Sequence, residues 1–221
     1  MDRRRSVSRS ELWEHPDQVA VRAGAGPDAR ARTSAPIVAT EGELAIRLLR
    51  NDPVDIALLT SWRAQPYVHA WWHPDRPAPS FDEVSATYGP QTHPSSPTTP
   101  CLIELEGRPI GYIQFYRWAA FAEEADAMHI EYDEDTFGLD VMIGVAELTD
   151  RGIGSRAVDL LCRHLEQERN ASRFALTTDI ENFRAQRAYE KAGFEKVRAV
   201  LDLDQRGGER ARSWLMVRVR R

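Results

Sequence analysis

The residues most able to do chemistry lie between positions 140 and 194, around a glycine turn that reads RGIGS at residues 151–155. Its two glycines remove Cβ atoms where the backbone would approach a ligand. The start of the helix that follows leaves N–H groups without intrahelical partners, which suits a phosphate or pyrophosphate. A Gly-x-Gly turn alone is weak evidence for a nucleotide, so the surrounding pattern has to support this interpretation.

Apolar periodicity predicts the elements that position this turn. A strand is expected over residues 139–145, and the apolar residues after Gly154 recur at the spacing of one helix face. A second strand is expected over residues 173–178, followed by a helix that Gly193 ends. The chemistry-bearing stretch is therefore a strand, turn, helix, strand and helix.

The chain before this stretch predicts a helical arm and a hairpin. Residues 44–48 alternate as in a half-buried strand, and Asp52 followed by Pro53 predicts a helix that runs to about residue 62. Ser80 and Glu83 fit a capping box that opens a helix reaching residue 88. A hairpin is expected over residues 101–118, and a closing antiparallel pair over 196–203 and 213–219.

Length and composition favour one folded domain with an extension. The 221 residues, 42% of them hydrophobic, suffice for one substantial core. Residues 1–40 are rich in Arg, Ser, Gly, Ala and Pro without a sustained period, so they are expected to be a flexible extension, with a single domain over residues 41–221. No run is long and apolar enough to cross a bilayer, and a cytoplasmic location is expected.

Charge and cysteine usage narrow the function classes. The net charge of −5 argues against general nucleic-acid binding. Cys101 and Cys162 lack the spacing of a zinc site or a redox dithiol, so no metal is expected. Acidic residues crowd positions 123–140 with no Lys or Arg between them. This run is either a solvated loop or a negative rim that attracts a polycationic substrate.

Two groups of sequence words carry a resemblance to a known family. The segment ENFRAQRAYEKAGF at residues 181–194 resembles the last block shared by GNAT-type N-acetyltransferases. Within that superfamily the chain is most similar to the aminoglycoside 6′-N-acetyltransferases, on GRPIGYIQ at 107–114, WW at 71–72, GLD at 138–140 and TD at 178–179. The resemblance implies the α/β (α+β) GNAT fold, a mixed and mostly antiparallel sheet flanked by helices, whose splayed central strands hold acetyl-CoA.

The resemblance also implies a donor site and an acceptor site. The pantetheine arm would pair with the backbone of one strand, and the pyrophosphate would bind the amides of the glycine turn. The donor-binding candidates are Val141, Met142, Ile143, Arg151, Gly152, Ile153, Gly154, Ser155, Arg156 and Asn182. The acceptor-binding candidates are Asp140, Asp179, Gln114, Trp72 and Tyr88. Asp150 stands where family members often have glycine, and we expect it to repel phosphate unless it points away, with Arg151 compensating.

Transfer of an acetyl group to an amine asks for a base and an acid. An aliphatic ammonium has a pKa well above 7, so a proton acceptor is needed, and Asp140 is the candidate. A backbone N–H near Met142 or Ile143 is the candidate oxyanion donor. Tyr189, by its family position, would protonate the leaving thiolate. Direct attack in a ternary complex is expected, because neither cysteine lies in the sequence motifs that carry the candidate catalytic residues.

The expected activity is acetyl-CoA-dependent acetylation of an aminoglycoside, at the 6′-amine, which would confer resistance. The expected partner is a small polycationic amine rather than nucleic acid or a membrane, and the chain is expected to be a monomer or homodimer. Three alternatives stay open: a siderophore-pathway acyltransferase acting on hydroxylysine, acetylation of protein or metabolite amines, and a non-catalytic module that binds acyl-CoA. Siderophore enzymes typically carry His in the strand where this chain has Asp140.

Overall fold

The structure, a computed structural model, describes residues 35–72, 74, 76–206 and 209–220. Its strands are β1 (Ile37–Glu41), β2 (Leu44–Leu48), β3 (Thr98–Leu105), β4 (Arg108–Arg117), β5 (Thr136–Ile143), β6 (Arg173–Asp179), β7 (Glu195–Arg206) and β8 (Glu209–Val219). Its α-helices are α2 (Pro53–Arg63), α3 (Pro66–His69), α4 (Phe81–Tyr88), α5 (Ala122–Ala127), α6 (Ile153–Glu168) and α7 (Phe183–Lys191). Short 3-10 turns are η1 (Pro90–Thr92), η2 (Trp118–Phe121) and η3 (Ala146–Leu148).

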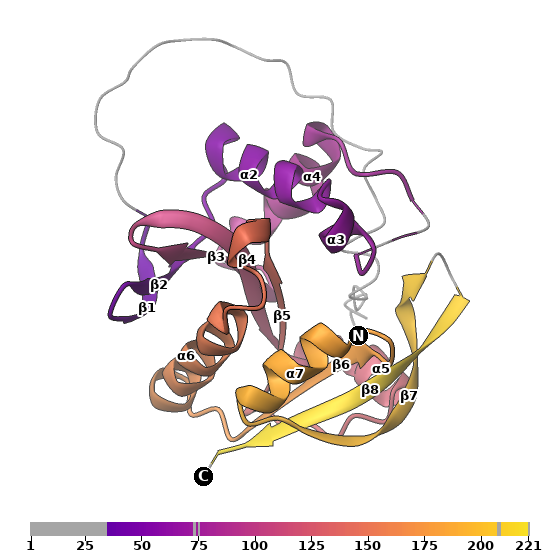
Figure 1. The fold of residues 1–221 in the computed structure, drawn as a ribbon. Helices are drawn as coiled ribbons and strands as arrows, with labels where there is room; N and C mark the ends of the chain where they lie inside the picture. The colour runs from indigo at the N-terminus through magenta and orange to yellow at the C-terminus, as the bar shows by residue number, and fades with distance from the viewer. Residues whose placement is uncertain (1–34, 73, 75, 207–208, 221) are drawn as a thin grey trace, which may run out of the picture.

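The strands form one eight-stranded sheet in the order β1-β2-β3-β4-β5-β6-β8-β7 (Figure 1). Neighbouring strands are antiparallel except for β5 and β6, which are parallel. The parallel pairing covers only Thr136 with Arg173 and Phe137 with Phe174. Past these two pairs the strands diverge, so the upper and lower halves of the molecule in Figure 1 separate there. This confirms the expected mixed, mostly antiparallel sheet with splayed central strands.

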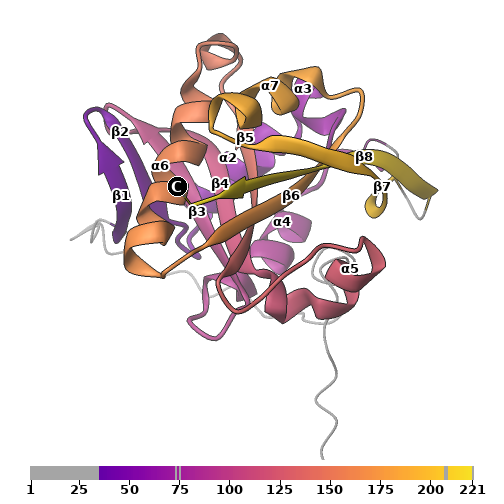
Figure 2. The ribbon, with the colours of Figure 1, turned by 90° about the horizontal axis from the view of Figure 1, so that it is seen from below.

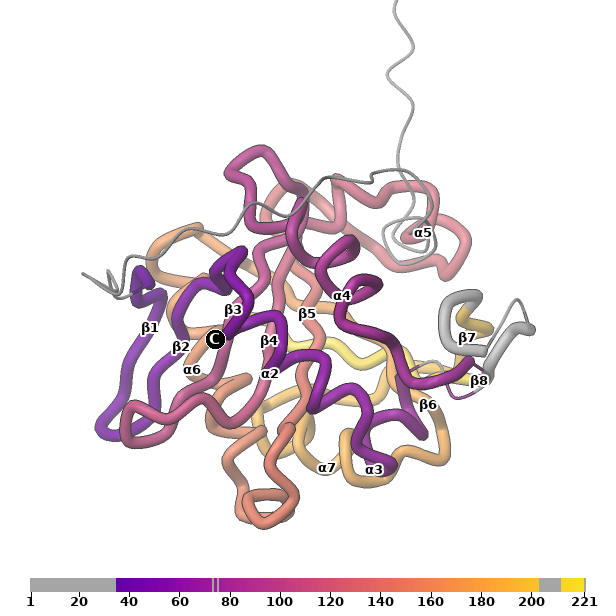
Figure 3. The backbone as a smooth tube through the Cα atoms, turned by 90° about the horizontal axis from the view of Figure 1, so that it is seen from above, coloured from indigo at the N-terminus to yellow at the C-terminus, as the bar shows by residue number. Residues whose placement is uncertain are grey.

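Helices cover both faces of the sheet. Helices α6 and α7 lie on one face, as Figure 2 shows, and the apolar residues of α6 enter a core with those of β2 to β6. Helices α2, α3 and α4 lie on the other face, in front of the sheet in Figure 3, and share a second core with Leu102, Tyr112 and Met142. A third core joins η2 and α5 to β6, β7 and β8. The site is therefore assembled where two cores meet at the diverging strands.

Local signals in the sequence account for the helical arm. Asp52 accepts hydrogen bonds from the N–H groups of Val54 and Asp55, which confirms the expected cap of α2. Ser80 and Glu83 form the reciprocal capping box expected at the start of α4. At the far end of α2, a Cβ on Gly144 would lie 2.0 Å from Trp62 Cγ, so only glycine lets α2 pack against the chain that leaves β5.

Some boundaries differ from those expected. Strand β1 begins at Ile37 and pairs with β2, so the folded sheet starts within the stretch assigned to the extension. Residues 1–34 of that stretch lie outside the described residues. Strand β5 begins at Thr136, three residues earlier than expected, which places Asp140 inside the strand. Among the described helices, none is long and apolar enough to cross a membrane.

Candidate active site

A cavity of about 550 Å³ opens where β5 and β6 diverge. Its walls come from α3 and the residues after it, the end of β5, the glycine turn and α7. The lining residues are Tyr67, Val68, Trp71, Trp72, Val141, Met142, Ile143, Leu148, Thr149, Asp150, Gly152, Gly154, Ser155, Asn182, Arg184, Ala185, Arg187, Ala188, Tyr189 and Lys191. The cavity is thus bounded by segments that are distant in the sequence but brought together by the fold.

The glycine turn forms one end of this cavity. Gly152 is the N-cap of α6 with φ 77°, a left-handed conformation that favours glycine. It has no side chain to cap the helix, so the first N–H groups of a 16-residue helix are left for a ligand. A Cβ on Gly154 would meet Ile143 Cγ1 at 3.7 Å, an ordinary contact. Packing therefore does not require glycine at position 154, and the space it leaves faces the cavity.

Asp150 beside this turn is held by an ion pair. Its carboxylate lies 3.2 Å from Arg184 Nε, and the two side chains are 66% and 54% exposed. Asp150 also has a positive φ of 59°. The partner of Asp150 is thus Arg184 on α7, whereas Arg151 was the expected compensating group. Arg184 lies 34 positions further along the chain, so its pairing with Asp150 could not be inferred from sequence proximity. Arg187 and Lys191 on α7 also line the cavity, so this wall is basic.

Helix α7 presents two of the expected site residues. The carboxamide oxygen of Asn182 caps the helix by accepting from the N–H of Ala185 at 3.1 Å, while the residue also lines the cavity. Tyr189 is 6% exposed, packs its ring against Phe194 with the ring centroids 5.7 Å apart, and lines the cavity. Both residues therefore reach the cavity from the helix that the sequence words predicted.

Strand register places a hydrogen-bonded chain at Asp140. Asp140 on β5 lies opposite Gln114 on β4. Tyr112 donates its hydroxyl hydrogen to Gln114 Oε1 at 2.5 Å, and Gln114 Nε2 donates to Asp140 Oδ2 at 2.7 Å. Burial raises the pKa of Tyr112 well above its usual value, so the hydroxyl stays protonated and fixes the orientation of the amide. The carboxylate of Asp140 is therefore held in one direction by a buried relay.

Aromatic rings surround this relay. Tyr88 lies 5.3 Å from Tyr112 in an edge-to-face contact, and Trp72 lies 6.2 Å from the same ring. The guanidinium of Arg63 lies 5.8 Å from the Trp72 centroid and 6.0 Å from that of Tyr88. Burial raises the pKa of Tyr88, and the charge of Arg63 lowers it in part. A cation is thus packed against two of the aromatic rings that surround the relay.

The expected site residues other than Asp179 fall into three groups. Those that line the cavity are Val141, Met142, Ile143, Gly152, Gly154, Ser155, Asn182, Tyr189 and Trp72. Asp140 directly precedes the lining part of β5, Arg151 and Ile153 alternate with lining residues of the turn, and Arg156 follows Ser155. None of these four residues lines the cavity itself. Gln114 and Tyr88 are buried and do not line the cavity. Gln114 donates a hydrogen bond to Asp140, and Tyr88 packs against Tyr112.

Asp179 is brought less directly to the cavity. It ends β6 and is 4% exposed. Its Oδ1 accepts a hydrogen bond from the N–H of Glu181 at 2.8 Å, which stabilises the turn into α7. Its backbone oxygen accepts from Gln186 Nε2 at 2.9 Å. The carboxylate therefore has a structural task at this turn, and it does not line the cavity.

Several residues at the site were not expected from the sequence. Tyr112 shares a strand face with Gln114, two positions on, and this alternation was a usable signal. Arg63, Tyr67 and Arg184 gave no such signal, because their positions depend on how α2, α3 and α7 pack.

The acidic run expected to be a solvated loop or a negative rim lies away from the cavity lining. Residues 123–135 form α5 and the loop after it, and none of them lines the cavity. Asp135 pairs with Arg117 at 3.4 Å and Glu131 with Arg173 at 3.1 Å. Part of the negative charge is therefore neutralised by basic residues from other strands. Within the described part of the chain, no cluster of three or more His, Cys, Asp or Glu is arranged to hold a metal ion.

A family model and two curated relatives that match this chain are all acetyltransferases. Residues 52–201 match the model described as an acetyltransferase (GNAT) domain. Over 142 residues the chain is 30% identical to aminoglycoside N(6′)-acetyltransferase type 1 of Klebsiella pneumoniae, covering 64% of this chain and 70% of the relative. The Serratia marcescens protein of the same name matches equally well.

Solved structures agree with the sequence comparison. The structure of AAC(6′)-Ib in complex with ribostamycin and coenzyme A superposes with a TM-score of 0.69 at 27% identity, covering 81% of this chain and 94% of the other. Its complex with paromomycin and acetyl-CoA gives a TM-score of 0.68 over the same shares. A spermidine N-acetyltransferase from Vibrio cholerae, with a TM-score of 0.61 at 17% identity over 80% of this chain and 95% of that one, shares the fold.

Proposed function

The chain belongs to the GNAT acetyltransferase family, and we propose that it transfers the acetyl group of acetyl-CoA to an aminoglycoside, at the 6′-amine. The observation that carries the proposal is the Asp140 carboxylate, held by Gln114 and Tyr112 directly before the part of β5 that lines the cavity. The similarity to aminoglycoside N(6′)-acetyltransferases supports the choice of acceptor.

The donor fits the end of the cavity at the glycine turn. The uncapped first turn of α6 offers backbone N–H groups for a pyrophosphate. Arg187 and Lys191 add positive charge along the same wall. The arm that carries the thioester would lie against Val141–Ile143, where β5 has left β6 and its backbone is open to a ligand with amide groups.

The acceptor fits the side of Asp140. A carboxylate can hold an ammonium by a charge-assisted hydrogen bond and then accept its proton, so that the neutral amine attacks the thioester carbon. A backbone N–H at Met142 or Ile143 would stabilise the negative charge that develops on the thioester oxygen. Tyr189, on the opposite wall, would return a proton to the departing thiolate.

Direct transfer without an acyl-enzyme agrees with the cysteines. Cys101 and Cys162 are fully buried, and burial raises the pKa of both thiols. A buried protonated thiol is a poor nucleophile. This supports the proposal that the acetyl group passes directly from donor to amine in one ternary complex.

The test measures CoA release from acetyl-CoA with kanamycin, ribostamycin, hydroxylysine and a peptide amine as acceptors. We expect turnover with the aminoglycosides, and a loss of roughly 10²- to 10⁴-fold in kcat for Asp140→Asn. Asp126→Asn, an exposed change on α5 that leaves the cavity intact, is the matched control and should retain activity. Turnover with another amine but with none of the aminoglycosides would refute the proposed acceptor.

A further inference from the structure

Tyr67 on α3 carries a polar group that the described structure does not use. Its ring lines the cavity, but its hydroxyl oxygen is closed off from water and has no hydrogen-bond partner among the described residues. Burying a hydroxyl without a partner costs stability, and phenylalanine would fill the same space without that cost. An unsatisfied buried group in a native structure calls for an explanation, and a ligand is one.

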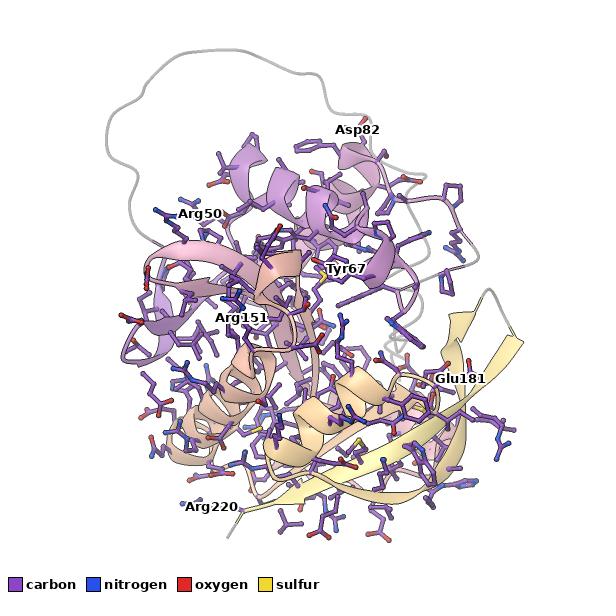
Figure 4. The ribbon with its side chains drawn as sticks, in the orientation of Figure 1. Arg50, Tyr67, Asp82, Arg151, Glu181 and Arg220 are labelled. Atoms are coloured by element: carbon purple, nitrogen blue, oxygen red, sulfur yellow. The ribbon has the colours of Figure 1, made fainter. Side chains whose placement is uncertain are left out.

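The surroundings of Tyr67 place it on the donor side of the cavity. Burial raises the pKa of its phenol, and the charge of Glu147 raises it further while that of Arg184 lowers it. Glu147 lies in η3, just before the glycine turn, and Arg184 pairs with Asp150 at that turn. Figure 4 shows Tyr67 between the upper helices and the level of Arg151. The acceptor carboxylate, Asp140, has other phenols as neighbours, namely those of Tyr88 and Tyr112.

We propose that the Tyr67 hydroxyl positions the acetyl donor by hydrogen bonding to the amide-bearing arm that joins its nucleotide to its thioester. This rests on the proposed acetyl-CoA donor and is independent of the acceptor. The arm offers amide N–H and C=O groups and a hydroxyl, each of which matches a phenol as partner. The hydroxyl oxygen is shielded from water, and a hydrogen bond made in such a place counts for more than it would in water.

The experiment compares Tyr67→Phe with the wild type by isothermal titration. The two probes are CoA, which has the arm, and adenosine 3′,5′-bisphosphate, which lacks it. We expect CoA binding to weaken roughly three- to tenfold in Tyr67→Phe, with binding of the bisphosphate unchanged. Tyr132→Phe is the matched control, since Tyr132 packs against the third core and lies outside the cavity wall.

Thermal unfolding without ligand separates positioning from a structural role. Since the hydroxyl has no described partner, the melting temperature of Tyr67→Phe should equal or exceed that of the wild type. Equal CoA affinity in the two proteins would overturn the inference. A lower melting temperature, or equal weakening of both probes, would also overturn it by assigning Tyr67 to the fold. If the wild type binds no CoA, the proposed donor itself is refuted, which is a distinct result.

Discussion

Replacing Asp55 by asparagine should remove the main electrostatic anchor of the helical arm. The Asp55 side chain is inaccessible to solvent. It accepts from Arg47 Nη1 at 2.6 Å and Nη2 at 3.0 Å, and from Arg50 Nη2 at 2.8 Å. These bonds fix the first turn of α2 to β2, and the far end of the same helix carries Trp62 and Arg63 to the site.

The size of the effect follows from the pKa of Asp55. Burial alone would raise this pKa, but the hydrogen bonds from Arg47 and Arg50 outweigh burial and lower it from 3.8 to about 2. A depression of that size corresponds to roughly 2 to 3 kcal/mol of stability at neutral pH. Because the variant also leaves the buried Arg47 without its bidentate partner, we expect a total loss of about 3–5 kcal/mol at pH 7.

The dependence on pH gives the sharper test. A carboxyl group whose pKa is lower in the folded protein stabilises the fold when the pH is above its pKa in the unfolded chain. Asp55 loses this contribution as the pH falls toward its folded pKa of about 2. Urea unfolding, followed by tryptophan fluorescence, should therefore show that the difference in unfolding free energy between wild type and Asp55→Asn narrows below pH 4. The part of this difference that comes from the charge of Asp55 should fall to about 1 kcal/mol at pH 3. Asp135→Asn, whose carboxylate is 48% exposed and pairs at 3.4 Å with Arg117, itself 38% exposed, is the control and should cost at most about 1 kcal/mol. A gap that does not narrow on acidification, or equal losses in both variants, would refute the reasoning.

Three further predictions concern the cavity. Tyr189→Phe should lower kcat by roughly 10²-fold with CoA affinity nearly unchanged, as single-turnover and binding measurements would show, and a loss confined to CoA affinity would contradict an acid role. Asp150→Asn should tighten CoA binding about two- to fivefold at low salt and less at high salt, because it frees Arg184 from its ion pair; weaker binding would contradict this. Cys101 and Cys162 should resist iodoacetamide in the native protein and carry no acetyl group during turnover, and mass spectrometry that finds acetyl-cysteine would exclude direct transfer.

Most helix and strand positions could be predicted because their signals are local. The cap at Asp52 and the capping box at Ser80 are fixed by residues three positions apart or fewer, and both are present as expected. Strand β1 was missed because residues 37–41 follow a long polar stretch and form an edge strand with mostly exposed side chains. An edge strand has a weak alternation, so pairing with β2 rather than sequence pattern defines it.

In the candidate site, too, features with a local sequence signal could be predicted, whereas contacts between distant segments could not. The glycine turn, Asn182 and Tyr189 lie on elements whose order the sequence words predicted, and all reach one cavity. Gln114 was predicted near the acceptor, but its contact with Asp140 depends on the register of β4 and β5. The pairing of Asp150 with Arg184 depends on the packing of α7 against the turn, for which a single sequence holds no signal.

The divergence of β5 and β6 also means that the molecule carries open strand edges in its interior. Exposed edges normally invite another chain to add a strand, which is a hazard for aggregation. Here the edge of β5 beyond Phe137 lines a cavity of about 550 Å³, which a flexible molecule with peptide-like amides could occupy. A bound donor would act as a missing strand between the two halves of the sheet. The proposed acetyl donor would therefore be recognised partly by backbone complementarity along its long arm, in addition to the group it delivers.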